Sequence, residues 1–394
     1  MLLSIALIII IGMLLGWACT KIKLPSLVGM LLTGIILGPY VCGLIDSSIL
    51  NISAELRKIA LIIILTRAGL SLDISGLKKI GRPAIMMCFV PATAELLGML
   101  ILGPAILGLD ILEAAILGAV LAAVSPAVVV PRMVKLIEEN YGTKSGIPQL
   151  ILAGASVDDI YVIVLFTTFT NIATGGSVSV IKFINIPASI VLGIVIGLAV
   201  GWLLAKYFEK CHIRDTAKVL LILSVSFILV SLEDALTGKL ASPITFSALI
   251  SIMFIGVGLQ RHREVVVPRL SQKYNKLWVA AEVFLFVLVG ASVDISYLGN
   301  IGLSAIVVIA GALVCRMFGV FICMIKTPIA TSERIFAMLA YTPKATVQAA
   351  IGGIPLAMGL ACGNVVLTVA VLAIVITAPL GAFAIDLSYK KLLK

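Results

Sequence analysis

Runs of about 20 apolar residues recur along nearly the whole of this 394-residue chain, and no other feature constrains its fold as strongly. A run of that length forms a helix that crosses a lipid bilayer. Hydrophobic residues make up 61% of the chain and charged residues only 12%, with a mean hydropathy of +1.22. Soluble domains carry roughly a quarter charged residues. We therefore expect an all-α polytopic membrane protein and exclude an ordinary soluble enzyme.

The apolar runs predict about 13 transmembrane helices joined by short loops, with no room for a soluble domain. The first run has no basic segment before it and no evident cleavage site, so we expect a retained helix rather than a signal peptide. In chain order the runs are 2–19, 24–45, 56–72, 83–108, 113–133, 147–171, 183–207, 217–233, 241–260, 276–293, 299–325, 334–359 and 363–387.

The basic residues predict how these helices are oriented. Of the 29 Lys and Arg residues, 22 fall in loops on one side of the predicted membrane and four on the other. The remaining three lie inside the runs, at Arg67, Arg316 and Lys344. Because basic loops stay in the cytoplasm, the N-terminus is predicted outside and the C-terminus inside. The net charge of +10 is then a topology signal, and no nucleic-acid partner is predicted.

Other site chemistries lack their motifs. The seven cysteines are dispersed without a CxxC pair, and His212 and His262 lie in basic loops, which argues against zinc or iron–sulfur sites. No Gly-rich phosphate loop is present, which argues against an ATP-driven pump. We expect no bound cofactor.

The two halves of the chain share short motifs. Residues 72–75 (Leu-Asp-Ile-Ser) and 293–296 (Val-Asp-Ile-Ser) are separated by 221 positions, and Ser125-Pro126 corresponds at a similar offset to Thr342-Pro343. Runs 1–6 and 8–13 are therefore predicted to be one unit used twice. Because equivalent runs cross the membrane in opposite directions, this is an inverted repeat, as in secondary transporters.

Pro126 and Pro343 each fall in the middle of an apolar run. Proline removes a backbone donor and breaks a helix, and unwound backbone at membrane depth is tolerated inside the protein or along a wet cavity. A matched pair of breaks points to a binding site between them. A packing kink is the alternative reading of either proline.

Asp158 and Asp159 are adjacent in the middle of the sixth run. A charge at the bilayer centre costs roughly 2.5–3.5 kcal/mol on insertion scales, so two carboxylates there require a function. Such a pair holds protons or a dehydrated monovalent cation, and competition between the two is antiport. A structural pair neutralised by Lys or Arg is the alternative. An intramembrane aspartyl protease is disfavoured, because adjacent helical residues point about 100° apart and no second mid-membrane aspartate lies on another run.

Glu95 and Arg316 differ by 221 positions and so are equivalent in the two halves. Residues related by a pseudo-two-fold meet when both lie near its axis, which predicts a buried ion pair. Two roles stay open for this pair: a structural contact that fixes two core helices, or a counter-charge that switches during transport. Lys344, beside Pro343, is predicted to offset the half-helix ends or the aspartates.

Several motifs together resemble the monovalent cation/proton antiporter superfamily, and most closely its sodium/proton antiporter branch of the NHA type, over nearly the whole chain. They are residues 23–29, 34–39, 67–70, 125–131, 158–159 and 343–350. The resemblance implies a homodimer in the cell (inner or plasma) membrane that exchanges Na⁺ or Li⁺ for H⁺ by alternating access. It places Asp159 as the principal cation ligand with Asp158 contributing charge, and Ser125, Val128 and Ser156 around the ion.

The resemblance also implies a division of the chain. Residues 1–50 and 216–264 are expected to form a dimerisation scaffold, 176–215 a linker helix, and 51–175 with 265–394 a mobile core. Strongly electrogenic bacterial relatives carry lysine where this chain has Arg316, and arginine keeps its proton at any relevant pH, which favours one-for-one exchange. The alternatives are exchange of K⁺ or of several monovalent cations for H⁺, and, from another class, an ion-gated sensor or a channel.

Overall fold

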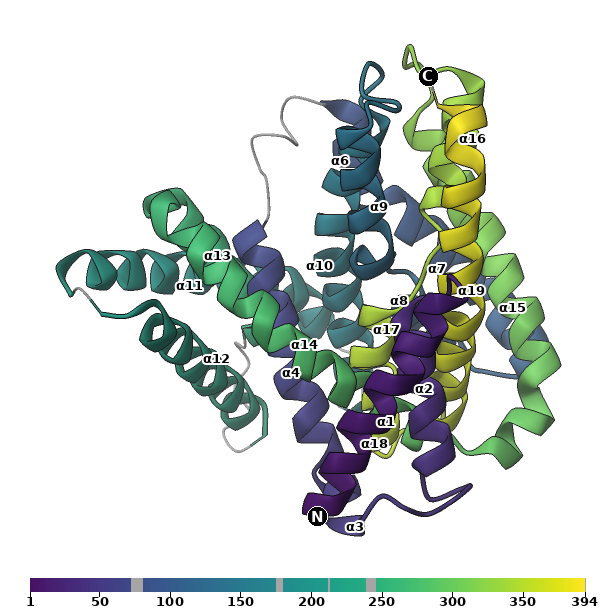
Figure 1. The fold of residues 1–394 in the computed structure, drawn as a ribbon, viewed down its shortest axis with the longest axis horizontal. Helices are drawn as coiled ribbons and strands as arrows, with labels where there is room; N and C mark the ends of the chain where they lie inside the picture. The colour runs from purple at the N-terminus through teal and green to yellow at the C-terminus, as the bar shows by residue number, and fades with distance from the viewer. Residues whose placement is uncertain (72–80, 175–179, 212, 239–245, 394) are drawn as a thin grey trace. The chain divides into compact units, whose positions relative to one another are not determined.

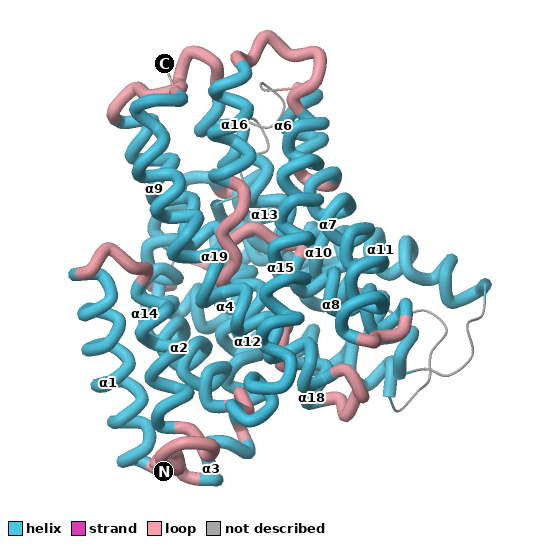
Figure 2. The backbone as a smooth tube through the Cα atoms, turned by 90° about the vertical axis from the view of Figure 1, so that its right-hand side faces the viewer, coloured by secondary structure: helices cyan, strands magenta, loops and turns pink. Residues whose placement is uncertain are grey.

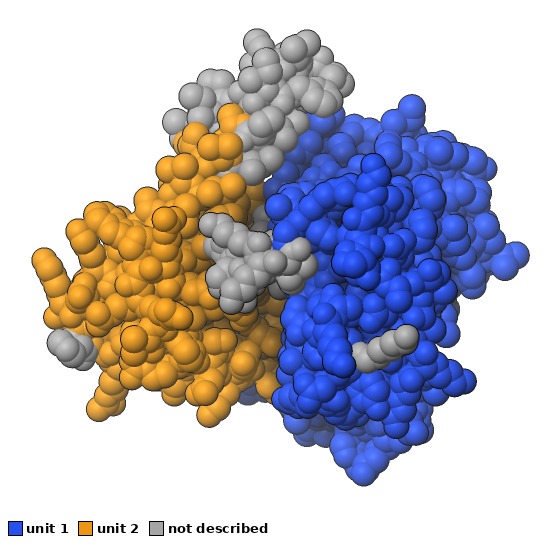
Figure 3. All heavy atoms as spheres, turned by 90° about the horizontal axis from the view of Figure 1, so that it is seen from above, with its two compact units in different colours: residues 1–55, 73–173, 283–394 blue, residues 56–72, 174–282 orange. Residues whose placement is uncertain are grey.

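The computed structural model describes residues 1–71, 81–174, 180–211, 213–238 and 246–393, and all regular structure in these ranges is helical (Figure 1). The chain divides into two compact units (Figure 3). Unit 1 comprises residues 1–55, 73–173 and 283–394, and unit 2 comprises residues 56–72 and 174–282. The expected polytopic all-helical architecture is confirmed.

Unit 1 holds most of the helices. They are α1 (Leu2–Lys21), α2 (Ser26–Leu37), α3 (Ser47–Asn51), α6 (Arg82–Met87), α7 (Val90–Leu102), the π-helix η1 (Gly103–Leu107), α8 (Ile111–Leu121), α9 (Pro126–Glu138), α10 (Ile147–Thr174), α15 (Ile295–Cys323), α16 (Thr331–Ala340), α17 (Thr346–Ile351), α18 (Ile354–Ala357) and α19 (Gly363–Leu392).

Unit 2 is built on α11 (Val180–Lys210), α12 (Asp215–Gly238), α13 (Ala248–His262) and the 3₁₀-helix η2 (Glu264–Val266). It also takes most of α4 (Ser53–Ser71) and the first part of α14 (Val267–Ala291). Helices α11 and α13 approach so closely that a Cβ at Gly197 would collide with the Ser251 carbonyl oxygen. The Ser251 hydroxyl also donates to the Gly193 carbonyl at 3.0 Å, so small residues and a polar contact join these apolar helices.

Nine helices in the described ranges are long and apolar enough to cross a membrane. Shorter apolar helices lie at Ser26–Leu37, Ala248–His262 and Thr346–Ala357. The count of 13 spans and the orientation stay predictions. Of the two Asp-Ile-Ser motifs, Asp294 accepts from the Ser296 amide at 2.9 Å and caps α15, whereas residues 72–75 lie outside the described ranges.

The second apolar run (24–45) was expected to be one helix, and that boundary is wrong. Helix α2 ends at Leu37 because the extended Gly38 (ψ 172°) turns the chain away and Pro39 has no amide to continue the helical hydrogen bonds.

The fifth and twelfth apolar runs are each interrupted near their middle. Helix α8 ends at Leu121 and α9 begins at Pro126, and likewise α16 ends at Ala340 and α17 begins at Thr346. Figure 2 shows these non-helical stretches of unit 1 as loops between helical segments. The candidate site lies here.

Candidate functional site

The first interruption follows from local sequence. Helix α8 starts at a capping box, in which Asp110 accepts from the Glu113 amide at 2.7 Å and Glu113 accepts from the Asp110 amide at 3.1 Å. Pro126 opens α9, and helical geometry is disfavoured for the residue before a proline, which agrees with the extended Ser125 (φ −88°, ψ 110°). The carbonyl groups at the end of α8 therefore have no helical partners.

The second interruption contacts the first directly. The Ser125 amide donates to the Pro343 carbonyl at 2.7 Å, so the two proline-containing breaks are joined through their backbones. On the far side of its break, the Lys344 amide donates to the Thr377 hydroxyl of α19 at 2.9 Å. Pro126 and Pro343 thus stand at two breaks that contact each other.

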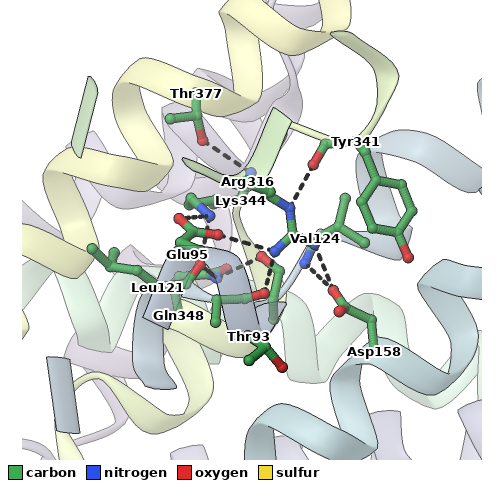
Figure 4. Close-up of polar contacts among 12 residues, drawn as sticks. Thr93, Glu95, Leu121, Val124, Asp158, Arg316, Tyr341, Lys344, Gln348 and Thr377 are labelled. Carbon is green, nitrogen blue, oxygen red and sulfur yellow. Dashed lines mark hydrogen bonds and ion pairs between the residues drawn. The ribbon is translucent and has the colours of Figure 1, made fainter. Parts of the chain in front are cut away.

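Side chains from three positions supply the missing donors at the end of α8 (Figure 4). The Gln348 side-chain amide donates to the carbonyls of residues 120, 121 and 123 at 3.1, 3.3 and 2.9 Å. The Lys344 ammonium donates to the Leu121 carbonyl at 2.5 Å, and the Arg316 guanidinium donates to the Ala122 carbonyl. Two cations are thereby placed against the negative end of a helix dipole.

The same two cations bind two buried carboxylates. Arg316 Nη1 lies 3.0 Å from Glu95 Oε2, and Lys344 Nζ lies 2.6 Å from Glu95 Oε1. Arg316 Nη2 lies 2.6 Å from Asp158 Oδ2, and none of these side chains is exposed. The Glu95–Arg316 pair predicted from the 221-residue offset is therefore present, but Arg316 binds Asp158 at the same time.

Close packing of α7 on α15 brings Glu95 to Arg316. A Cβ at Gly98 would lie 2.6 Å from Cys315 Sγ, and a Cβ at Gly319 would lie 3.0 Å from Ala94 Cβ. Gly98 and Gly319 differ by 221 positions, as do Ala94 and Cys315. The two contacts are thus reciprocal, as a two-fold relationship between the helices requires.

Asp158 and Asp159 have different surroundings. Asp158 Oδ2 accepts from the Val124 amide at 2.9 Å in addition to Arg316. Asp159 is 7% exposed and forms no ion pair with any described residue. Asp158 Oδ1, Asp159 Oδ1 and the Ser125 hydroxyl are buried without a hydrogen-bond partner. Buried oxygens are rarely left in this state, so each needs an explanation.

Of the two other predicted ligands, the structure places Val128 in full and Ser156 by its backbone. Val128 is buried in the first turn of α9, where its amide donates to the Ser125 carbonyl at 3.2 Å. The backbone of Ser156 belongs to α10, but its side chain lies outside what the structure describes. In the described residues no group of three or more His, Cys, Asp or Glu side chains is arranged to hold a metal ion.

Sequence reasoning missed four contributors to this site. Gln348 carried a usable signal, because an amide inside an apolar run needs buried partners. Thr377 and Tyr341, whose carbonyl accepts from Arg316 Nε at 2.7 Å, gave no signal of their own. The Val124 amide was equally unpredictable, because it is free of helical hydrogen bonds only through the break in which it lies.

Comparison with known proteins identifies the family of this chain. The family model described as "Sodium/hydrogen exchanger, transmembrane" matches residues 5–387. Sodium/hydrogen exchanger 9B2 of Homo sapiens is 34% identical over 393 residues, covering 94% of this chain and 70% of that protein. Sodium/hydrogen exchanger 9B2 of Xenopus tropicalis is 33% identical over 400 residues, covering 96% and 72%.

The fold has a counterpart among solved structures. The sodium proton antiporter MjNhaP1 from Methanocaldococcus jannaschii at pH 8 matches with a TM-score of 0.85 over 98% of this chain and 97% of that chain. Its sequence identity of 21% makes this a likeness of fold.

Proposed function

The chain belongs to the sodium/hydrogen exchanger family, whose members are transporters rather than enzymes, and from that premise we propose that it exchanges Na⁺, and also Li⁺, for H⁺ across the membrane. Asp159 is the group that carries either the proton or the cation. The protein needs no bound cofactor, because its substrates are the two ions themselves.

The balance of charge in the buried cluster is the observation that carries this proposal. Arg316 and Lys344 supply two positive charges, and Glu95 and Asp158 supply two negative charges through contacts of 2.6–3.0 Å. The cluster is neutral without Asp159. A buried, ionised Asp159 therefore needs a further cation, either H⁺ or a metal ion, and competition for that one position is exchange.

Asp158 serves as the fixed partner. Arg316 and the Val124 amide both bind its Oδ2 and stabilise its ionised form. Its Oδ1 and the Ser125 hydroxyl are buried oxygens available to a dehydrated monovalent cation beside Asp159, together with Val128 and Ser156 as the family resemblance implies. Proton and cation then compete at a single carboxylate.

Alternating access uses the crossed breaks. We assign the 13 predicted spans to two inverted repeats, with Pro126 and Pro343 at equivalent breaks. The core (51–175 and 265–394) moves against a scaffold (1–50 and 216–264) through the linker (176–215). The scaffold forms a homodimer in the inner or plasma membrane, with the N-terminus outside. The reciprocal packing of Gly98 and Gly319 supports the repeat.

Proteoliposomes test the proposal directly. An imposed pH gradient should be dissipated by Na⁺ and by Li⁺, each added separately. If the protein exchanged K⁺ instead or as well, added K⁺ would dissipate the gradient at an equal rate. Asp159→Asn should abolish cation-driven proton flux, since an amide has similar shape but holds neither ion. Asp110→Asn is the matched control, because Asn caps a helix as well as Asp. More than about a tenth of wild-type flux in Asp159→Asn would refute the assignment, since a tenfold loss is only about 1.4 kcal/mol of barrier.

A further inference from the structure

Unit 2 contains a basic cavity that takes no part in the proposed exchange. The cavity measures about 300 Å³ and lies where α11 and α13 end and where α12 and α14 begin. Its charged lining residues are four cations and one carboxylate: Arg214, Lys218, Arg263, Arg269 and Asp215. These residues come from two connections that are about 50 positions apart in the chain, so the fold gathers them at one place.

The single carboxylate does not neutralise this lining. Asp215 accepts from Lys218 at 2.9 Å and lies 3.5 Å from Arg269. Glu209, which is outside the lining, lies 3.5 Å from Arg263, whose Nε is nevertheless buried without a hydrogen-bond partner. Arg214 forms no ion pair within the described part of the chain. The lining of the cavity therefore carries a net positive charge, and some of its N–H donors are left for a ligand.

The lining is also held in place before any ligand arrives. The side chain of Lys218 is only 8% exposed, and its ammonium lies 5.8 Å from the centre of the Phe208 ring. Helices α12 and α14 are 24 and 25 residues long, and both begin at this cavity. The positive ends of their dipoles favour an anion there.

We propose that this cavity binds a phosphate group, supplied by the headgroup of an anionic phospholipid. Arginine side chains present planar pairs of donors that match phosphate oxygens, and three of the four cations are arginines. Exposed apolar side chains lie on the two helices next to the cavity, with Leu203 of α11 56% exposed and Leu220 of α12 60% exposed. These two helices therefore offer acyl chains an apolar surface. A free phosphate monoester is the other source of the same chemistry.

The test measures binding to the purified full-length chain in detergent. The probes are a short-chain fluorescent phosphatidylglycerol, the same lipid with a phosphatidylcholine headgroup, and glycerol 3-phosphate as the soluble source. Arg214→Gln/Arg269→Gln removes two exposed cations of the lining. Arg82→Gln/Lys144→Gln removes two exposed cations outside it and is the matched control. Thermal unfolding with and without each probe gives a second readout of binding.

Phosphatidylglycerol should bind at least tenfold more tightly than phosphatidylcholine and raise Tm by about 3–5 °C. The lining variant should lose at least tenfold in affinity and most of that rise, whereas the control variant stays within twofold. Equal binding of glycerol 3-phosphate with the same dependence on Arg214 and Arg269 would support the site and assign it to soluble phosphate. Equal affinities of the lining and control variants would overturn the proposal.

Discussion

Arg316 and Asp158 form an ion pair of 2.6 Å in which neither side chain has any exposed surface. The same guanidinium binds Glu95 at 3.0 Å and donates to the Tyr341 carbonyl at 2.7 Å. A single arginine thereby ties α7, α10 and the break after α16 together. The two adjacent aspartates therefore differ chemically, because Asp158 is paired with a permanent cation and Asp159 with none among the residues that the structure describes.

Asp158→Asn should both destabilise the protein and stop exchange. Arg316 then loses its closest carboxylate, and breaking a buried pair by removing one partner costs about 3–5 kcal/mol. Arg316 and Lys344 then share only Glu95, so the charge of Asp159 is needed to balance the second cation; Asp159 would be held ionised and would not exchange ions. Unfolding free energy and Na⁺-driven proton flux measure the two effects. Wild-type flux from Asp158→Asn would contradict this role, and Asp110→Asn again controls for the change of charge.

Glu95 should be strongly coupled to Arg316 in stability. Glu95→Gln leaves both Arg316 and Lys344 without their shared carboxylate, whereas Arg316→Gln leaves Glu95 paired with Lys344. We expect the double variant to lose less unfolding free energy than the two single variants lose together, by about 0.5–3 kcal/mol. A double-mutant cycle on the unfolding free energy measures this coupling. Additive losses would show that the contact contributes nothing.

Gln348 should be important for stability. Gln348→Met keeps roughly the same volume but removes the donor to three carbonyls at the end of α8, and leaving buried acceptors unpaired costs about 1–3 kcal/mol. Gln149→Met is the control, because Gln149 lies in α10 and its side-chain oxygen has no partner to lose. Equal Tm values for the two variants would mean that Gln348 does not hold the end of α8.

The amino-acid pattern predicted the helices well because lipid leaves few choices. Apolar runs of bilayer length must be helical, and the prolines at 126 and 343 mark breaks in two of them, whereas Pro131 and Pro379 lie inside the continuous helices α9 and α19. Helix ends were less predictable. Helix α14 begins at Val267, nine residues before its apolar run, because Arg269 and Lys273 continue the helix beyond the apolar segment.

Lys344 was expected at a half-helix end, and it donates to the Leu121 carbonyl at the end of α8. The rest of the buried network was predicted only where two residues shared the repeat offset. Glu95 and Arg316 were paired on that ground, but the simultaneous contact of Arg316 with Asp158 depends on how α7, α10 and α15 pack. Contacts made by backbone atoms, such as the Val124 amide on Asp158, have no trace in side-chain identity. The tertiary packing that creates them is not encoded in a local motif.

The proposed competition at one carboxylate predicts the pH dependence of Na⁺ transport. A proton on Asp159 must leave before Na⁺ binds, so the apparent KM for Na⁺ should rise as the pH falls. In the acidic range the rise should be about tenfold per pH unit for one competing proton. Initial rates at several Na⁺ concentrations and pH values measure the slope. A hundredfold rise per unit would show that two protons compete.

The number of protons also decides whether exchange moves net charge. Because Arg316 pairs with Asp158 and stays charged itself, and Lys344 is paired with Glu95 at 2.6 Å, we expect Asp159 alone to take up and release a proton as Na⁺ binds. One Na⁺ then replaces one H⁺, and the loaded core carries the same charge in both directions. Na⁺-driven flux in liposomes clamped at different potassium-diffusion potentials should therefore be insensitive to voltage. Arg316→Lys should introduce voltage dependence, because a lysine at this position, unlike arginine, can release its proton as Na⁺ binds and so adds a second titrating group. Flux of the unmodified chain that accelerates several-fold with voltage would contradict one-for-one exchange and show that a second group cycles its proton.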